Sequence, residues 1–177
     1  HTADTWIHTV GRFFPDFAGR VHVIHNGLDY DVYRPTATDT VRERLGITGE
    51  HDFILYPHRP EAAKGIRQTI RLIDKLVNDY GLTSVRLLLP RWIDTDIAPD
   101  VRAFYDELRH DITARGLDAY FVFHDWVGDD LMPAYYSLGC LTLALGNYVE
   151  TFGNTPYESL ACGTPVLAAR VGPYRDM

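Results

Sequence analysis

Short apolar runs alternate with stretches of helical periodicity along most of this 177-residue chain. This alternation constrains the fold more than any other feature of the sequence. Five runs have the length and the apolar content of buried strands: residues 53–56, 85–89, 120–123, 141–145 and 166–169. Because parallel strands are joined by helical crossovers and are buried on both faces, the pattern predicts an α/β fold with a doubly wound parallel sheet.

The helical stretches have recognisable ends. Residues 62–78 repeat apolar side chains at helical spacing and end at Gly81, and residues 99–115 do the same and end at Gly116. A short helix is expected from Thr40, in capping-box spacing with Glu43, to Gly46. Two more are expected over 129–136, capped by Asp129, and over 156–161. A weakly helical segment at 2–17 and a β-branched run at 21–24 precede all of these.

Composition excludes several classes of protein. The net charge of −7 argues against binding to a nucleic-acid backbone. No apolar run is long enough to span a membrane, and no signal peptide is visible. The two cysteines form no CxxC pair, and the eight histidines show no ligand spacing, so neither a disulfide scaffold nor a metal site is expected. The chain begins at His1 and ends just after a predicted strand, as expected of a piece of a longer protein.

Ligands of doubly wound folds bind at the carboxyl ends of the strands, near a switch point. The loops to search are therefore residues 57–65, 90–96, 124–129, 146–157 and 170–174. These loops hold no GxGxxG, Walker A or GxSxG motif. Trp92 and Trp126 follow strand ends, where they could line a pocket, although packing in the core is the more common role.

The loop from Gly146 to Glu158 runs from a predicted strand into a predicted helix. Gly153 allows close backbone approach, and Thr155 is a candidate N-cap before Pro156. The free N–H groups of such a helix start favour an anion, and the carboxylates of Glu150 and Glu158 suit sugar hydroxyls. Two structural alternatives stay open: Glu158 could close a capping box with Thr155, and Glu150 could be a solvated loop residue.

The loop after the first strand holds Arg59 and Lys64, which bracket the start of the long helix. Two cations at a helix N-terminus oppose the helix dipole, so their placement makes sense if an anion binds between them. Arginine offers a planar fork to phosphate oxygens and lysine a point charge. The alternative is a solvated surface pair.

Taken together, four segments in order resemble glycosyltransferase family 4, the glycosyl transferases group 1. The segments are Val23-Ile-His-Asn-Gly-Leu-Asp29 with Tyr33-Arg-Pro35, then Arg59 with Lys64-Gly65, then Phe123-His-Asp-Trp-Val127 with Asp130-Leu131 and Tyr135-Tyr136, and finally Glu150-Thr-Phe-Gly-Asn-Thr-Pro-Tyr-Glu158 with Ser-Leu-Ala-Cys-Gly-Thr-Pro-Val after it. The match covers nearly all of the chain from about Arg20 onward.

The resemblance implies the C-terminal, donor-binding half of a GT-B fold, which pairs two Rossmann-like domains. It implies a retaining, hexosyltransferase-type enzyme that uses a UDP-, GDP- or ADP-sugar without a metal ion or other cofactor. Arg59 and Lys64 would hold the diphosphate and stabilise its charge as it leaves, aided by backbone N–H groups around Phe152, Gly153 and Asn154 at the helix start near Thr155. Glu158 would bind ribose hydroxyls, Glu150 the hexose hydroxyls, and the loop at Val127 the base.

The resemblance also divides the chain. Residues 1–20 would be a linker or the end of an N-terminal domain, and residues 21–177 a nucleotide-sugar-binding domain truncated at its C-terminus. The isolated piece would bind nucleotide weakly and transfer nothing. The longer protein would work in the cytoplasm, where sugar nucleotides reside, on an acceptor that the sequence does not identify. Peripheral membrane contact of that protein stays open.

The chain departs from the family at several positions. His58 stands where the family usually has Gly, and His25 where it has Pro. Leu89-Pro90-Arg91, Gly139-Cys140 and Leu145-Gly146 replace the usual glycine-rich turn, Ala-Asp and Pro-Ser. These changes bear on donor preference and leave two alternatives: a catalytically silent nucleotide-binding or scaffolding domain of the same fold, and a related GT-B phosphorylase, synthase or epimerase.

Overall fold

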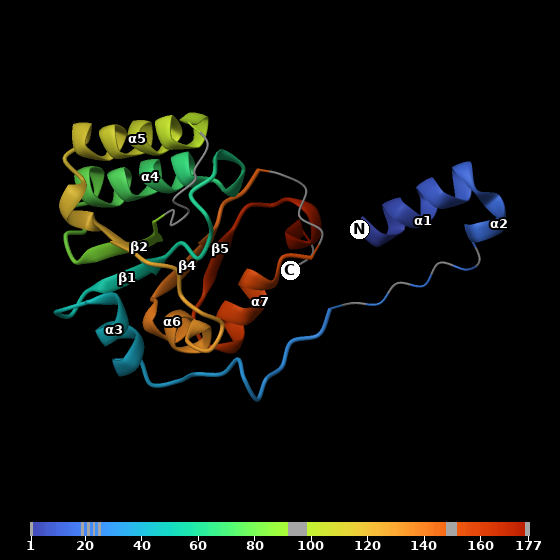
Figure 1. Cartoon of the computed structure of the whole chain (residues 1–177), viewed down its shortest axis with the longest axis horizontal. Helices are drawn as coiled ribbons and strands as arrows, with labels where there is room; N and C mark the ends of the chain where they lie inside the picture. Colours follow the sequence, from blue (N-terminus) through green and yellow to red (C-terminus); the bar gives the residue numbers. More distant parts are fainter. Residues whose placement is uncertain are drawn as a thin grey trace.

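The computed structural model describes residues 2–18, 20, 22, 24, 26–91, 99–147 and 152–175. Helices α1 (Thr2–Phe13) and α2 (Pro15–Ala18) lie apart from an α/β body that begins at α3 (Asp39–Leu45) (Figure 1). Of the β-branched run at 21–24, His22 and Ile24 are described, and neither is in a strand. None of the helices in the described ranges is both long and apolar enough to cross a bilayer.

The body is built on one five-stranded sheet. Its strands are β1 (Asp52–Leu55), β2 (Val85–Pro90), β3 (Phe121–His124), β4 (Leu141–Ala144) and β5 (Val166–Ala168). All neighbouring strands are parallel, and their order is β3-β2-β1-β4-β5. The five expected strands and the parallel sheet are thereby confirmed, and each strand end lies within one residue of its expected position.

Helices cover both faces of the sheet, so the fold is doubly wound (Figure 1). On one face α4 (Ile66–Asp74) and α5 (Pro99–Ala114) pack their apolar stripes against the strands, and on the other lie α3, α6 (Met132–Leu138) and α7 (Asn154–Ala161). Ile66, Ile70 and Ile73 are fully buried, as the periodicity predicts. The layered arrangement is Rossmann-like.

Short irregular turns complete the body. Three 3-10 turns are η1 (Ala62–Lys64), η3 (Asp118–Tyr120) and η4 (Gly172–Arg175), and α4 continues into a π-helical turn, η2 (Lys75–Asp79). The long helix expected over 62–78 is therefore interrupted at Gly65 and changes its hydrogen bonding in its last turn.

Glycines end the helices as predicted, whereas the predicted caps are wrong. Gly46, Gly81 and Gly116 all have left-handed backbone conformations, with φ of 64°, 67° and 70°. Helix α3 starts at Asp39 behind Thr38, which makes no side-chain capping bond, so the capping box from Thr40 does not form. Helix α6 starts at Met132 behind Leu131, because residues 129–131 form a turn and Asp129 lies outside the helix.

The strand order places a switch point beside β1. Strand β1 pairs with β2 on one side and with β4 on the other. The chain leaves β1 toward α4 on one face of the sheet and leaves β4 toward α7 on the other face. Because β1 and β4 are parallel neighbours, the loops that follow them emerge side by side at the same edge. The two loops that hold most of the candidate site residues are the ones brought to this edge.

Candidate functional site

The loops after β1 and β4 are bonded to each other. The backbone N–H of Asn147 donates to the carbonyl of Ala63 at 3.1 Å. This bond joins the turn η1, which follows Arg59, to the chain that leads toward α7. The structure therefore brings the loop of Arg59 and Lys64 against the first part of the predicted Gly146–Glu158 loop, as the switch point implies.

Gly65 makes this contact sterically feasible. A Cβ atom built on Gly65 would lie 2.3 Å from the carbonyl oxygen of Leu145 and 2.5 Å from its carbonyl carbon. Gly65 also has φ of +83°, a conformation that side chains rarely adopt. Any other residue here would push the two loops apart. The close packing explains why this turn needs glycine directly after Lys64.

Arg59 and Lys64 lie on a loop that its own backbone bonds hold in shape. The N–H of Glu61 donates to the carbonyl of Arg59 at 2.7 Å, and the N–H of Lys64 donates to the carbonyl of Glu61 at 3.0 Å. The Arg59 side chain is exposed, and that of Lys64 is half-buried in η1. His58 packs edge-on against Tyr56, with ring centroids 5.3 Å apart.

The start of α7 is formed by glycine and not by threonine. Gly153 is the residue before the helix, with φ of 73°, and no side chain caps the helix there, so the N-cap role predicted for Thr155 is wrong. Phe152 stacks on Tyr157, with centroids 4.9 Å apart and rings inclined by 18°. The first N–H groups of α7, from Asn154 onward, therefore have no side-chain cap as partner. Glu150 lies outside the described residues.

Glu158 is half-buried and does not close a capping box. Its Oε2 accepts a hydrogen bond from the Tyr136 hydroxyl at 2.8 Å. The next residue, Ser159, anchors α7 to the sheet because its hydroxyl donates to the Thr164 carbonyl at 2.9 Å and shares a hydrogen bond of 2.8 Å with the Thr142 hydroxyl, which can donate to it. The carboxylate is thus held toward α6 by a partner that the sequence reasoning missed.

The hydroxyl of Tyr136 is buried and held as a hydrogen-bond donor. Burial, followed by the nearby charge of Glu158, raises the pKa of Tyr136, so its hydroxyl stays protonated and donates. Thr155 also interacts with this hydroxyl. Tyr135 and Tyr136 belong to the segments that carry the family resemblance, but the contact between Tyr136 and Glu158 spans 22 residues and leaves no local signal in the sequence.

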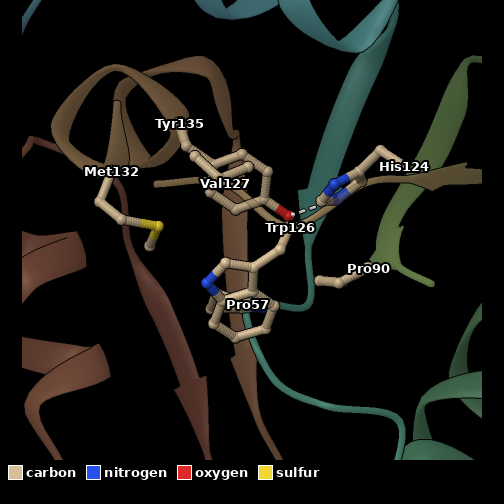
Figure 2. Close-up of a pocket in the computed structure, with 7 residues that line it drawn as sticks. All are labelled: Pro57, Pro90, His124, Trp126, Val127, Met132 and Tyr135. Carbon is tan, nitrogen blue, oxygen red and sulfur yellow. Dashed lines mark hydrogen bonds between the residues drawn. The ribbon is translucent and has the colours of Figure 1, made fainter. Parts of the chain in front are cut away.

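A small apolar pocket lies at the carboxyl ends of β2 and β3 (Figure 2). It is lined by Pro57, Pro90, His124, Trp126, Val127, Met132 and Tyr135. Its volume of about 30 Å³ has room for little more than a water molecule. The Val127 side chain is only 6% exposed, whereas Trp126 is 53% exposed at the rim, so Trp126 lines a pocket instead of packing in the core. Trp92 lies outside the described residues.

His124 is a buried neutral side chain in this pocket. Its Nδ1 lies 2.7 Å from the Asp125 carbonyl and must donate to it, and Nε2 then accepts from the Tyr135 hydroxyl at 3.1 Å (Figure 2). Burial lowers the pKa of His124 below its ordinary 6.5, with Arg91 contributing in the same direction. The imidazole therefore serves as a fixed wall and not as a charged ligand.

The lowered pKa predicts a pH dependence of stability. Below about pH 6.5 the unfolded chain takes up a proton at this histidine before the folded chain does, so the free energy of unfolding falls as pH falls. His124→Asn keeps a donor near Nδ1 and removes the titration, so it should flatten the curve between about pH 6.5 and 5. Urea unfolding across this range measures it, with the exposed His110→Asn as control. An unchanged slope in His124→Asn would contradict the prediction.

Two residues at which the chain departs from the family pattern lie away from the carboxyl ends of the strands. Gly139 and Cys140 precede β4, at the opposite end of that strand from the candidate site. A Cβ on Gly139 would lie 2.6 Å from Leu55 Cγ and Cδ1, so glycine is needed there to accommodate a core leucine. Among the described residues, no three His, Cys, Asp or Glu side chains gather as a metal site would require.

Comparison with known proteins agrees with this geometry. The family model described as glycosyl transferases group 1 matches residues 37–177. The chain belongs to this family. Relatives include D-inositol 3-phosphate glycosyltransferases from Catenulispora acidiphila, 28% identical over 86% of this chain and 36% of that protein, and from Mycobacterium avium, 31% identical over 86% and 34%. The chain thus spans about a third of the length of these relatives.

Solved group 1 and related glycosyltransferases show the same fold. HepE from Anabaena, solved with UDP and glucose, superimposes with a TM-score of 0.73 at 24% identity, over 90% of this chain and 41% of HepE. The C-terminal domain of the group 1 protein LpcC from Francisella tularensis gives 0.66 at 20% identity, over 84% and 73%. The predicted Rossmann-like half of a GT-B fold is therefore confirmed.

Proposed function

We propose that this chain is the donor-binding domain of a glycosyltransferase that uses a nucleoside diphosphate sugar. The observation that carries the proposal is the bonded pair of loops at the switch point, where Ala63 accepts from Asn147 and Gly65 packs on Leu145. This junction holds the cation-bearing loop beside the chain that leads to α7. The similar fold of HepE, solved with UDP and with UDP-glucose, supports a nucleotide sugar as ligand.

The diphosphate would lie between the two loops. Arg59 and Lys64 supply positive charge, and the N–H groups at the start of α7 supply donors and the positive end of a helix dipole. As the glycosidic bond breaks, the leaving diphosphate gains charge, and these groups stabilise that charge most in the transition state. In the retaining reaction that we propose, the acceptor attacks from the face that the diphosphate leaves, with no metal ion taking part.

The sugar and nucleoside would be held on either side of the diphosphate. Glu158 binds the ribose hydroxyls, Glu150 the hexose hydroxyls, and the loop at Val127 the base. The domain comprises residues 21–177, and residues 1–20 link it to, or end, a preceding domain. Because the chain spans about a third of its relatives, the proposal is confined to the donor: alone, the chain binds nucleotide weakly and transfers no sugar.

The proposal predicts selective binding of one nucleoside diphosphate. In thermal unfolding with UDP, GDP and ADP, a ligand at about 100 times its Kd adds roughly 2.7 kcal/mol, or about 5–11 °C in Tm for a domain of this size. The matching monophosphates are the control and should shift Tm far less. Equal shifts with mono- and diphosphates, or none with any of the six at millimolar concentration, would contradict the proposed diphosphate site and favour a scaffolding domain of the same fold.

A further inference from the structure

The Glu158 carboxylate is approached by two tyrosine hydroxyls from different parts of the chain. Tyr136 of α6 donates to Oε2 at 2.8 Å. Tyr33, more than 100 residues earlier, packs its ring beside that of Tyr136 and lies near enough to Glu158 to be affected by the charge of that carboxylate. The two tyrosine rings lie 6.4 Å apart, inclined by 52°. Glu158 is therefore bordered by two phenols that restrict how its carboxylate can turn.

Tyr33 belongs to a segment, residues 29–36, that is held by hydrogen bonds on both sides of Tyr33. Asp29 Oδ1 accepts from the N–H of Asp31 at 2.9 Å, and the Asp29 carbonyl accepts from the N–H of Tyr33 at 2.8 Å, forming a tight turn. Beyond Tyr33, the N–H of Thr36 donates to Ser137 Oγ on α6 at 3.0 Å. The turn and the α6 contact together place the Tyr33 ring, so its hydroxyl is not a freely moving neighbour.

The environment keeps Tyr33 protonated. Burial, followed by the nearby charge of Glu158, raises the pKa of Tyr33 to about 12. At neutral pH the hydroxyl therefore stays protonated beside the carboxylate and is never a competing anion.

We infer that Tyr33 is a positioning residue of the donor site: with Tyr136 it sets the orientation of the Glu158 carboxylate that a nucleotide ribose would meet. The inference rests on the proposed function, because it assumes that Glu158 contacts ribose hydroxyls. A carboxylate offers about four acceptor sites on its two oxygens. With Tyr136 bonded to Oε2 and the Tyr33 ring packed beside Tyr136, the remaining sites are presented in a fixed direction, which suits a pair of neighbouring hydroxyls.

A fixed carboxylate should distinguish a ribose from a 2′-deoxyribose better than a mobile one. The test is calorimetric binding of UDP, GDP and ADP, each against its 2′-deoxy form, to the full 177-residue chain. Wild type should bind the ribose form of its preferred nucleotide about tenfold more tightly or better, as expected for a hydrogen bond to a charged group. Tyr33→Phe keeps the ring and should lower this ratio about threefold or more, mainly by weakening the ribose form.

Control variants separate positioning from simple loss of structure. Tyr30→Phe makes the same change on the same segment at a side chain that is 72% exposed, and should leave the ratio unchanged. Tyr136→Phe should act like Tyr33→Phe, and Glu158→Gln should bring the ratio close to one. Affinity for the 2′-deoxy form reports any general damage to the site, and should stay within about twofold in Tyr33→Phe.

The outcomes separate a failure of the positioning role from a failure of the proposed function. If wild type discriminates and Glu158→Gln does not, but Tyr33→Phe keeps the full ratio, the positioning role is wrong and the donor site stands. If wild type binds a diphosphate but prefers neither sugar, the ribose contact and the positioning role both fail. If no nucleotide binds, the proposed function fails and the inference falls with it.

Discussion

Gly65→Ala is expected to destabilise the chain by about 3 kcal/mol or more, lowering Tm by roughly 6–12 °C. Two costs add at this position. An alanine at φ of +83° is strained by about 1–2 kcal/mol, and its Cβ would lie 2.3 Å from the Leu145 carbonyl oxygen. The opposing atom belongs to the backbone at the end of β4, so it cannot turn away as a flexible side chain would. Chemical denaturation with circular dichroism measures the loss.

Gly116→Ala is the matched control for this substitution. Gly116 has a similar φ of +70°, but a Cβ there would meet nothing within 4 Å, so only the strain of about 1–2 kcal/mol applies. Gly65→Ala should also weaken nucleotide binding, because it separates the loops that the Ala63–Asn147 bond joins. Equal destabilisation by both variants, with binding intact, would show that the loops do not need the close approach.

Removing either cation of the first loop is expected to weaken diphosphate binding about 10- to 100-fold. A hydrogen bond to a charged group is typically worth about 1.5–3 kcal/mol, and both Arg59 and Lys64 would make such bonds to phosphate oxygens. Arg59→Ala and Lys64→Ala should lose affinity for the diphosphate and change affinity for the nucleoside little. For the proposed sugar transfer by the longer protein, loss of one such group should raise the barrier by roughly 3–4 kcal/mol.

Each of these two substitutions also removes one positive charge from the protein. Surface variants that remove the same charge elsewhere show whether the loss of affinity comes from the site or from the change in net charge. Arg102→Ala removes an exposed arginine on α5, and Lys75→Ala removes a lysine that is 69% exposed and paired with Asp79 at 3.2 Å. Both change the net charge as the site variants do and should keep wild-type affinity. A uniform loss across all four variants would indicate nonspecific attraction of the nucleotide and would remove Arg59 and Lys64 from the site.

The sheet and its helices could be predicted from the sequence because the signals are local and repeated. Each strand is a short apolar run, and Gly46, Gly81 and Gly116 mark helix ends through their left-handed conformations. The caps failed because a cap depends on the backbone just outside the helix, which loop packing decides. Gly153 and not Thr155 starts α7, for instance, where Phe152 stacks on Tyr157.

The site was predicted in its parts and not in its contacts. The two loops were found because parallel strands deliver them to one edge, and Arg59 and Lys64 lie there as expected. The surroundings of Glu158 were missed because its hydrogen-bond partner Tyr136 comes from α6, and Tyr33 packs beside Tyr136 from the 29–36 segment, at sequence separations that no spacing rule covers. Only the folded chain decides between the two alternatives left open for Glu158: it forms no capping box and accepts from Tyr136.

The most direct test of the central claim is to locate a bound nucleotide on the chain. Titration of the ¹⁵N-labelled protein with UDP, GDP and ADP reports which backbone amides sense the ligand. The account predicts that one diphosphate perturbs Gly65, Asn147, Gly153 and Asn154 most strongly, at the junction of the two loops. Largest changes instead along α5, around the separate pocket that Asp100, Val101 and Phe104 line with Pro60 and Ala62, would contradict it, as would no change with all three.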